Sequence, residues 1–139
     1  MGQQQVLLVV LAIILVSIAT VVGVTIFKGQ TNQSSVDAMV SDLNNFGAAA
    51  QQYRMKPKSL GGGAGTFTDF SEHFILLADN LTETDSDPTI RNVNATYILT
   101  KEEDTELIIT AVSSFNPSIK RSIAIYTNGD TDLFIPSED

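Results

Sequence analysis

The chain opens with a long apolar segment. Residues 6–27 read VLLVVLAIILVSIATVVGVTIF and contain no charged residue and no proline. At about 1.5 Å per residue, a helix of this length covers roughly 33 Å, enough to cross the roughly 30 Å hydrocarbon core of a membrane. Apolar side chains occur on every side of such a helix, which is unlike a surface helix of a globular domain. The pattern predicts a membrane span or a helix packed in equally apolar surroundings.

A second helical pattern, amphipathic this time, follows a polar interval at residues 28–32. Residues 3–54 contain no proline, so they form either one long helix or two helices separated by local unwinding near Gly29. Pro57 disfavours helix at the residues before it, and the glycines of residues 61–65 end the element. Apolar residues recur at helical spacing, which predicts a stripe that packs on the rest of the protein: Val36, Met39, Val40, Leu43, Phe46, Ala50 and Tyr53.

Strand-like alternation fills the C-terminal part, at residues 96–101, 106–113, 118–127 and 132–135. Asn128-Gly129 between the last two is a strong hairpin signal. Residues 74–79 are expected to begin a short helix or strand, and residues 83–87 to form a loop. One apolar sheet face is predicted from Ile98, Leu107, Ile109, Ile119, Ile123, Ile125, Leu133 and Ile135.

The apolar sheet face and the amphipathic helix need each other, because neither can bury its apolar surface alone. The predicted fold class is therefore α+β, with a long N-terminal helix, apolar in its first half and amphipathic in its second, packed on a small antiparallel sheet.

Composition narrows the function. The net charge of -8 disfavours a nucleic-acid binder, because an acidic surface repels phosphates. The absence of cysteine excludes disulfides, thiolate metal sites and cysteine nucleophiles. His73 is the single histidine, and with no second metal ligand or nucleophile beside it we expect a surface or partly packed residue. The sequence predicts no enzyme, no metal and no cofactor.

Several local patterns are weaker. Residues 61–66 lack the lysine of a phosphate loop and are expected to be a flexible connection. The acidic clusters at residues 85–87 and 128–132 lack the complete calcium-loop pattern and are expected to be solvated turns, as is the hairpin tip at 102–106. Lys56 and Lys58 either dock a subunit on acidic neighbours or complement the helix end.

Three positions match the N-glycosylation acceptor pattern, at Asn32, Asn80 and Asn94. On an exposed filament surface Asn80 and Asn94 are better placed than Asn32 to carry a sugar. Both are kept as candidate modification sites.

The order of these elements resembles type IV pilins over the whole chain. The residues that carry the resemblance are GQQQVLLVVLAIILV at the start and DLNNFGAAAQQYRMKPKSLGGGAGTFTDF at residues 42–70. The resemblance implies three parts. Residues 1–28 are a transmembrane or filament-core helix, residues 29–58 its amphipathic continuation, and residues 59–139 a glycine-rich loop with a C-terminal β domain.

Pilins are made with a basic leader that a prepilin peptidase removes after a glycine. The familiar glutamate at the fifth mature position is thought to neutralise a neighbour's N-terminal amine. We favour Met1 or a nearby residue as the processed start. If Met1 is the first mature residue, Gln5 takes that place; cleavage after Gly2 would put Leu7 there. Glutamine can hydrogen-bond an ammonium group but does not match its charge.

The resemblance implies a structural subunit that assembles with copies of itself into an extracellular helical filament. A pilus-type assembly machinery would act on it, and the inner membrane would hold it before assembly. Small residues at Ala12, Ser17, Ala19 and Gly23 would permit close helix approach. The expected filament-core residues are Met1, Gln5, Val6, Leu7, Val10, Leu11, Ile14, Leu15, Ile18, Val21, Val22, Ile26 and Phe27.

The alternative is a single-span membrane protein whose extracytoplasmic β domain binds a partner in an envelope complex. All 8 basic residues, beginning with Lys28, follow the apolar segment, which taken alone predicts a cytoplasmic C-terminal domain. Removal of a basic leader would reverse that reading, and the rest of the chain favours removal. A cleavable secretory signal fits poorly, because the apolar run is too long and MGQQQ has no basic residue.

Overall fold

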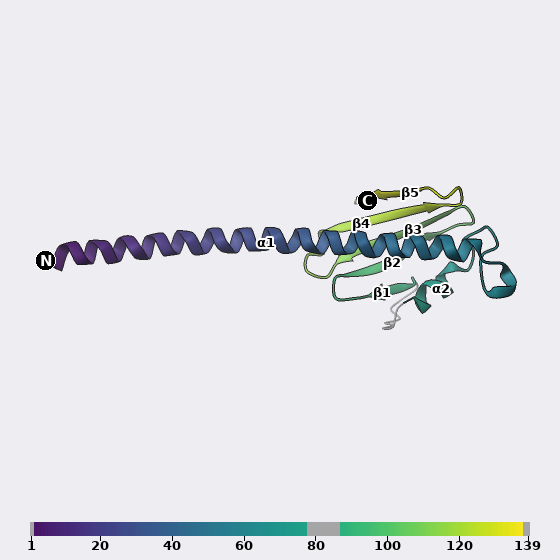
Figure 1. The fold of residues 1–139 in the computed structure, drawn as a ribbon, viewed down its shortest axis with the longest axis horizontal. Coiled ribbons are helices and arrows are strands. Elements are labelled where there is room, and N and C mark those ends of the chain that lie inside the picture. Colours follow the sequence, from purple (N-terminus) through teal and green to yellow (C-terminus); the bar gives the residue numbers. More distant parts are fainter. Residues whose placement is uncertain (1, 78–86, 138–139) are drawn as a thin grey trace. The chain divides into compact units, whose positions relative to one another are not determined.

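The computed structural model describes residues 2–77 and 87–137 (Figure 1). The helices are α1 (Gly2–Met55), the short 3₁₀ turn η1 (Lys58–Leu60) and α2 (Phe70–Leu76). The strands are β1 (Thr89–Arg91), β2 (Ala95–Glu102), β3 (Glu106–Ser113), β4 (Lys120–Tyr126) and β5 (Thr131–Phe134). The chain divides into two compact units, Met1–Ser34 and Ser35–Asp139. We call the second the folded unit.

Helix α1 is a single element of 54 residues, so of the two alternatives the uninterrupted helix is found. Its backbone stays helical through Gly29, where an added Cβ would meet nothing within 4 Å. The helix ends at Met55, two residues before Pro57, as the restriction on residues that precede proline predicts.

The five strands form one antiparallel sheet in the order β1-β2-β3-β4-β5, so that every strand pairs with its neighbours in sequence (Figure 1). The second half of α1 lies across one face of this sheet, which confirms the predicted α+β class. Strand β3 coincides with its predicted range, and β2, β4 and β5 each differ from theirs by no more than two residues at either end. The sequence reading missed β1 and placed the start of α2 four residues too late.

The core lies between α1 and the sheet. Of the seven predicted packing residues, Met39, Leu43, Ala50 and Tyr53 are buried, whereas Val36, Val40 and Phe46 are half-buried. The Phe46 ring still packs edge-on against Phe74 and Tyr97, with ring centroids 5.4 and 5.0 Å apart. The remaining large core side chains come from the segment around α2 and from the sheet: Phe67, Phe70, Phe74, Ile90, Tyr97, Leu99, Leu107, Ile109, Ile123 and Ile125.

Three residues of the predicted apolar sheet face lie outside the buried core. In β2 the core side chains are Ala95, Tyr97 and Leu99, and Ile98 is on the opposite face, half-buried and paired with Thr110. Leu133 pairs with the core residue Ile123 but is 47% exposed, because β5 is an edge strand whose four residues are all exposed. Ile135, one residue beyond β5, is 68% exposed. The alternation of strands was predicted correctly, but the face of β2 and the burial of β5 were not.

The glycine-rich loop caps the C-terminus of α1. The Gly63 amide donates to the Tyr53 carbonyl at 3.0 Å and the Gly65 amide to the Arg54 carbonyl at 2.8 Å. These bonds satisfy carbonyl groups that the end of a helix leaves without partners. A Cβ at Gly63 would lie 2.0 Å from the Thr66 carbonyl oxygen, so this position accepts only glycine without rearrangement. Residues 61–66, predicted to be a flexible connection, are therefore a hydrogen-bonded loop that caps the C-terminus of α1.

Candidate functional site: the apolar segment

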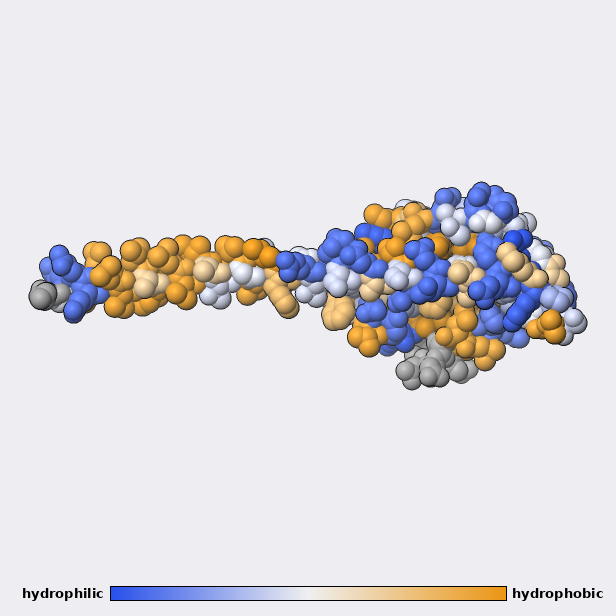
Figure 2. Space-filling view, in the orientation of Figure 1, coloured by the Kyte–Doolittle hydropathy of each residue, from blue (hydrophilic) through white to orange (hydrophobic). Residues whose placement is uncertain are grey.

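The surface that stands out is the apolar segment, residues 6–27 of α1. Its large side chains are all exposed, from 49% at Leu11 to 68% at Leu7 and Phe27. Figure 2 shows hydrophobic residues along this part of the helix, in contrast to the mixed surface of the folded unit. By length and composition α1 could span a membrane: its most apolar stretch of 18 residues has a mean hydropathy of 3.1, and none of that stretch is buried. An apolar surface of this extent calls for an apolar partner, either lipid or protein.

The hydroxyl groups of this segment do not interrupt its apolar character. Ser17, Thr20 and Thr25 each donate to the carbonyl four residues earlier, at 2.7, 2.8 and 2.9 Å. Because each hydroxyl proton has an acceptor within the same helix, no donor needs water. The sequence reading treated Ser17 only as a small residue. These bonds could have been predicted from the sequence, because Ser and Thr hydroxyls within a helix commonly donate to the carbonyl four residues earlier.

The N-terminal turn carries no acidic residue. Gln5, which the sequence analysis placed at the position of the familiar pilin glutamate, lies in α1 and is exposed. Met1 lies outside the described residues. Every other predicted filament-core residue lies on α1 and is exposed, so the segment is free to meet a partner on any side.

The folded unit has an open hollow of about 420 Å³ beside the C-terminus of α1, lined in part by Tyr53, Lys58, Glu72 and His73. The Tyr53 hydroxyl donates to the Thr68 carbonyl at 2.8 Å, and its ring lies 5.2 Å from that of His73. Burial lowers the pKa of His73, and the nearby Lys56 charge lowers it further. His73 is thus a partly packed residue of the wall.

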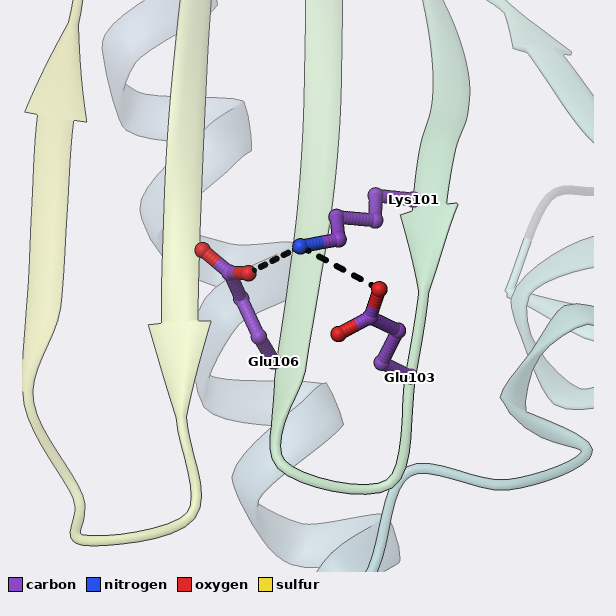
Figure 3. Close-up of polar contacts among 3 residues, drawn as sticks. All are labelled: Lys101, Glu103 and Glu106. Carbon is purple, nitrogen blue, oxygen red and sulfur yellow. Dashed lines mark hydrogen bonds and ion pairs between the residues drawn. The ribbon is translucent and has the colours of Figure 1, made fainter.

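Lys101 is clamped at the acidic hairpin tip between β2 and β3. Its Nζ lies 2.5 Å from Glu106 Oε2 and 3.3 Å from Glu103 Oε1 (Figure 3). These carboxylates raise the pKa of Lys101, with Glu106 the larger influence. The tip is solvated, as the sequence suggested, but one of its strands supplies a counter-charge.

The remaining sequence candidates are scattered. Asn94 is half-buried in the turn between β1 and β2, whereas Asn80 and most of the cluster at residues 85–87 lie outside the described residues. In the other acidic cluster the Asn128 amide donates to Asp130 Oδ2 at 2.6 Å. Among the described residues no group of three or more His, Asp or Glu side chains is placed to hold a metal ion.

These observations leave one extended surface with a chemical character of its own: the apolar segment, with its internally bonded hydroxyls, joined in one helix to a folded unit. Such a surface offers no catalytic group, and what it can do is bury itself in lipid or against other apolar helices. Comparison of the chain with protein-family models, with curated proteins and with solved structures finds no match.

Proposed function

We propose that this protein is the structural subunit of an extracellular, type IV pilus-like helical filament. In this proposal the apolar segments of many copies bundle along the filament axis, and the folded units form its surface. Before assembly the same segment anchors each subunit in the membrane. The partner of the chain is therefore first of all another copy of itself.

The observation that carries the proposal is an apolar, exposed segment continuous with the helix that completes the core of the folded unit. Burying one Val, Leu or Ile fully stabilises by roughly 1.5–3 kcal/mol relative to leaving it in water. With more than a dozen such side chains, a water-exposed subunit is untenable. Lipid and a helical bundle are the two environments that satisfy this surface.

A bundle of identical helices also explains the remaining features of the segment. Ala12, Ala19 and Gly23 permit close approach of neighbouring helices, and at Gly23 an added Cβ would meet nothing within 4 Å. Head-to-tail contacts that do not close into a ring produce an open filament. If Met1 is the first mature residue, Gln5 would offer a neighbour's amine a hydrogen bond without a matching charge.

The test is to shear cells of the source organism and to image the released material by cryo-electron microscopy. We expect thin filaments whose axial density accommodates residues 6–27 as a helical bundle. A chain that stays in the membrane fraction and sheds no filaments would refute the proposal. It would favour a single-span protein whose β domain binds a partner in an envelope complex.

One substitution separates membrane insertion from assembly. Leu15→Lys places a charge near the middle of the segment, at a cost of about 2.5–3.5 kcal/mol for insertion, which the surrounding apolar residues outweigh. In a bundle of apolar helices that charge has no partner. We expect Leu15→Lys to fractionate with membranes yet form no filaments, whereas the control Leu15→Met does both. Filaments of normal yield from Leu15→Lys would contradict a core built from this segment.

A further inference from the structure

Two turns of the folded unit present apolar side chains to solvent. Val93, in the turn between β1 and β2, is 82% exposed, and Phe115, between β3 and β4, is 59% exposed. The turns are neighbours, because the Ser114 amide donates to the Asn94 carbonyl at 3.0 Å. Ser113 Oγ in turn lies 2.9 Å from Ser35 Oγ. Both turns therefore lie at the end of the sheet where α1 enters the folded unit (Figure 1).

Each turn is held by its own polar groups. Asn92 Oδ1 accepts hydrogen bonds from the amides of Asn94 and Ala95, both at 2.9 Å. Ser113 Oγ accepts from the amides of Phe115 and Asn116, both at 3.3 Å. Most backbone amides of the two turns thus have hydrogen-bond partners, and the exposed tip residues Val93 and Phe115 have apolar side chains. This pairing lowers the cost of bringing the tips into the boundary between headgroups and acyl chains.

Basic residues flank the same two turns. Arg91 and Lys120 end one cross-strand row of the sheet, in which Arg91 pairs with Thr96, Thr96 with Val112 and Val112 with Lys120. Neither turn contains an acidic residue, at 92–94 or at 114–119. We call Arg91, Val93, Phe115 and Lys120 the basic end of the folded unit.

The opposite end of the sheet is acidic. Glu103 and Asp104 occupy the turn between β2 and β3, with Glu102 and Glu106 on its flanks, and Asp130 lies between β4 and β5. At the basic end, the two carboxylates that α1 contributes are Asp37 and Asp42, and both interact with other residues. The two turns where α1 enters thus lack the acidic residues of the opposite turns and are flanked by Arg91 and Lys120, whereas Lys56, Lys58 and Lys101 lie at the opposite end beside its carboxylates.

We propose that the basic end docks on an anionic lipid surface, that of the membrane which the apolar segment enters. Only residues 28–34 separate that segment from the folded unit, so the chain itself keeps the basic end within reach of the headgroups. Val93 and Phe115 enter the boundary between headgroups and acyl chains, and Arg91 and Lys120 bind lipid phosphates. The acidic end faces away, where it is not repelled.

Docking holds the folded unit at the membrane surface for as long as the apolar segment is inserted in the membrane. The inference goes beyond filament formation and needs only that the apolar segment inserts. If the basic end docks on lipid, glycosylation of Asn94 and docking exclude each other, because a glycan on Asn94 would hold the turn away from the membrane.

The absence of cysteine from the chain allows a direct test by single labels. The full chain would carry Val93→Cys, Phe115→Cys or, as a control at the acidic end, Thr105→Cys, each labelled with an environment-sensitive fluorophore. Proteoliposomes of phosphatidylcholine, with or without phosphatidylglycerol, would contain a lipid quencher attached at the headgroup. We expect strong quenching at positions 93 and 115 in the anionic vesicles, weaker quenching in neutral vesicles, and little at position 105.

A second set of variants isolates the charges. Arg91→Gln with Lys120→Gln should weaken docking in anionic vesicles about fivefold for each side chain removed, at low salt. Lys56→Gln with Lys58→Gln makes the same charge change at the other end and should leave quenching unaltered. Equal quenching at all three labels, or quenching at 93 and 115 that ignores both lipid charge and the Arg91 and Lys120 substitutions, would overturn the proposal. No assembly system is present, so the result does not depend on whether the protein forms filaments.

Discussion

Tyr97 illustrates how single polar bonds fix the helix on the sheet. Its ring is fully buried, and its hydroxyl donates to Asp42 Oδ2 at 2.5 Å, where the Asn92 amide also donates at 2.9 Å. Burial and the bond to Asp42 raise the pKa of Tyr97 far above its usual value, so the hydroxyl stays a donor. The bond joins α1 to β2 across the edge of the core.

Tyr97→Phe should destabilise the folded unit by about 1–2 kcal/mol, because it keeps the ring packing and removes a hydrogen bond to a carboxylate. Urea unfolding of a chain that lacks residues 1–34 measures the change. In an Asp42→Ala background the same substitution should cost much less, since the acceptor is already gone. Equal costs in the two backgrounds would show that the hydroxyl stabilises in some other way.

His73 supplies a pH signal of known sign. With its pKa lowered by burial and by Lys56, the unfolded chain binds the proton more readily than the folded one. The contribution of His73 to stability is therefore complete above about pH 6.5 and is lost as the pH falls toward the folded-state pKa.

An NMR titration of the single histidine should give a pKa below the ordinary value of about 6.5. Lys56→Gln should raise this pKa only part of the way back, because burial is the larger cause. Lys120→Gln, the same charge change at the other end of the sheet, should not move it. A pKa at or above the ordinary value would mean that the ring is not packed as described.

Residue-level prediction from sequence succeeded where spacing alone decides burial. The helical spacing of Met39, Leu43 and Tyr53 identified core positions of α1. It failed in β2, where the sequence reading chose Ile98 for the core and the fold buries Tyr97 instead. Aliphatic character does not reveal that a tyrosine with a carboxylate in reach can be buried, because the partner, Asp42, is 55 residues away.

At the scale of elements, the loop after α1 requires glycine at position 63, where the backbone of Thr66 leaves no room for a Cβ. Gly63→Ala should destabilise by about 2–3 kcal/mol, since its Cβ would strike the Thr66 carbonyl and break the cap on α1. Ser59→Ala, at an exposed position of η1, should have little effect. Thermal unfolding of both variants, without residues 1–34, compares them. Equal stability would show that the loop yields freely and that the cap contributes little.

Element boundaries were predictable in proportion to the length of their pattern. Strand β3, with eight alternating residues, was identified to the residue, whereas β1 has only three and offers no period to detect. Helix α2 has seven residues, too few for a clear stripe, and its core side chains Phe70 and Phe74 are a single turn apart. In the proposed filament, the residues of the apolar segment that would touch a neighbouring copy depend on several chains, so no pattern within one chain identifies them.

At the scale of the whole molecule, α1 has two apolar surfaces, of which one is buried against the sheet and the other is exposed. The amphipathic half of α1 is satisfied within the chain, since its stripe covers the sheet. Among residues 2–77 and 87–137 the apolar segment has no such partner, and its large side chains are all exposed. Stability of the folded unit and self-association of the protein should therefore be separable by truncation.

A chain without residues 1–34 should be soluble without detergent, monomeric and as cooperatively folded as any small domain, because Ser35–Asp139 retains the whole core cluster. The full chain should require detergent and should associate when detergent is removed, since its exposed segment then meets only water or other copies. Light scattering after size-exclusion chromatography distinguishes the two behaviours. In cells that assemble the full chain, the truncated form should be absent from the filaments. If the truncated chain formed long filaments by itself, its contacts would lie between folded units, and the apolar segment would serve only as an anchor.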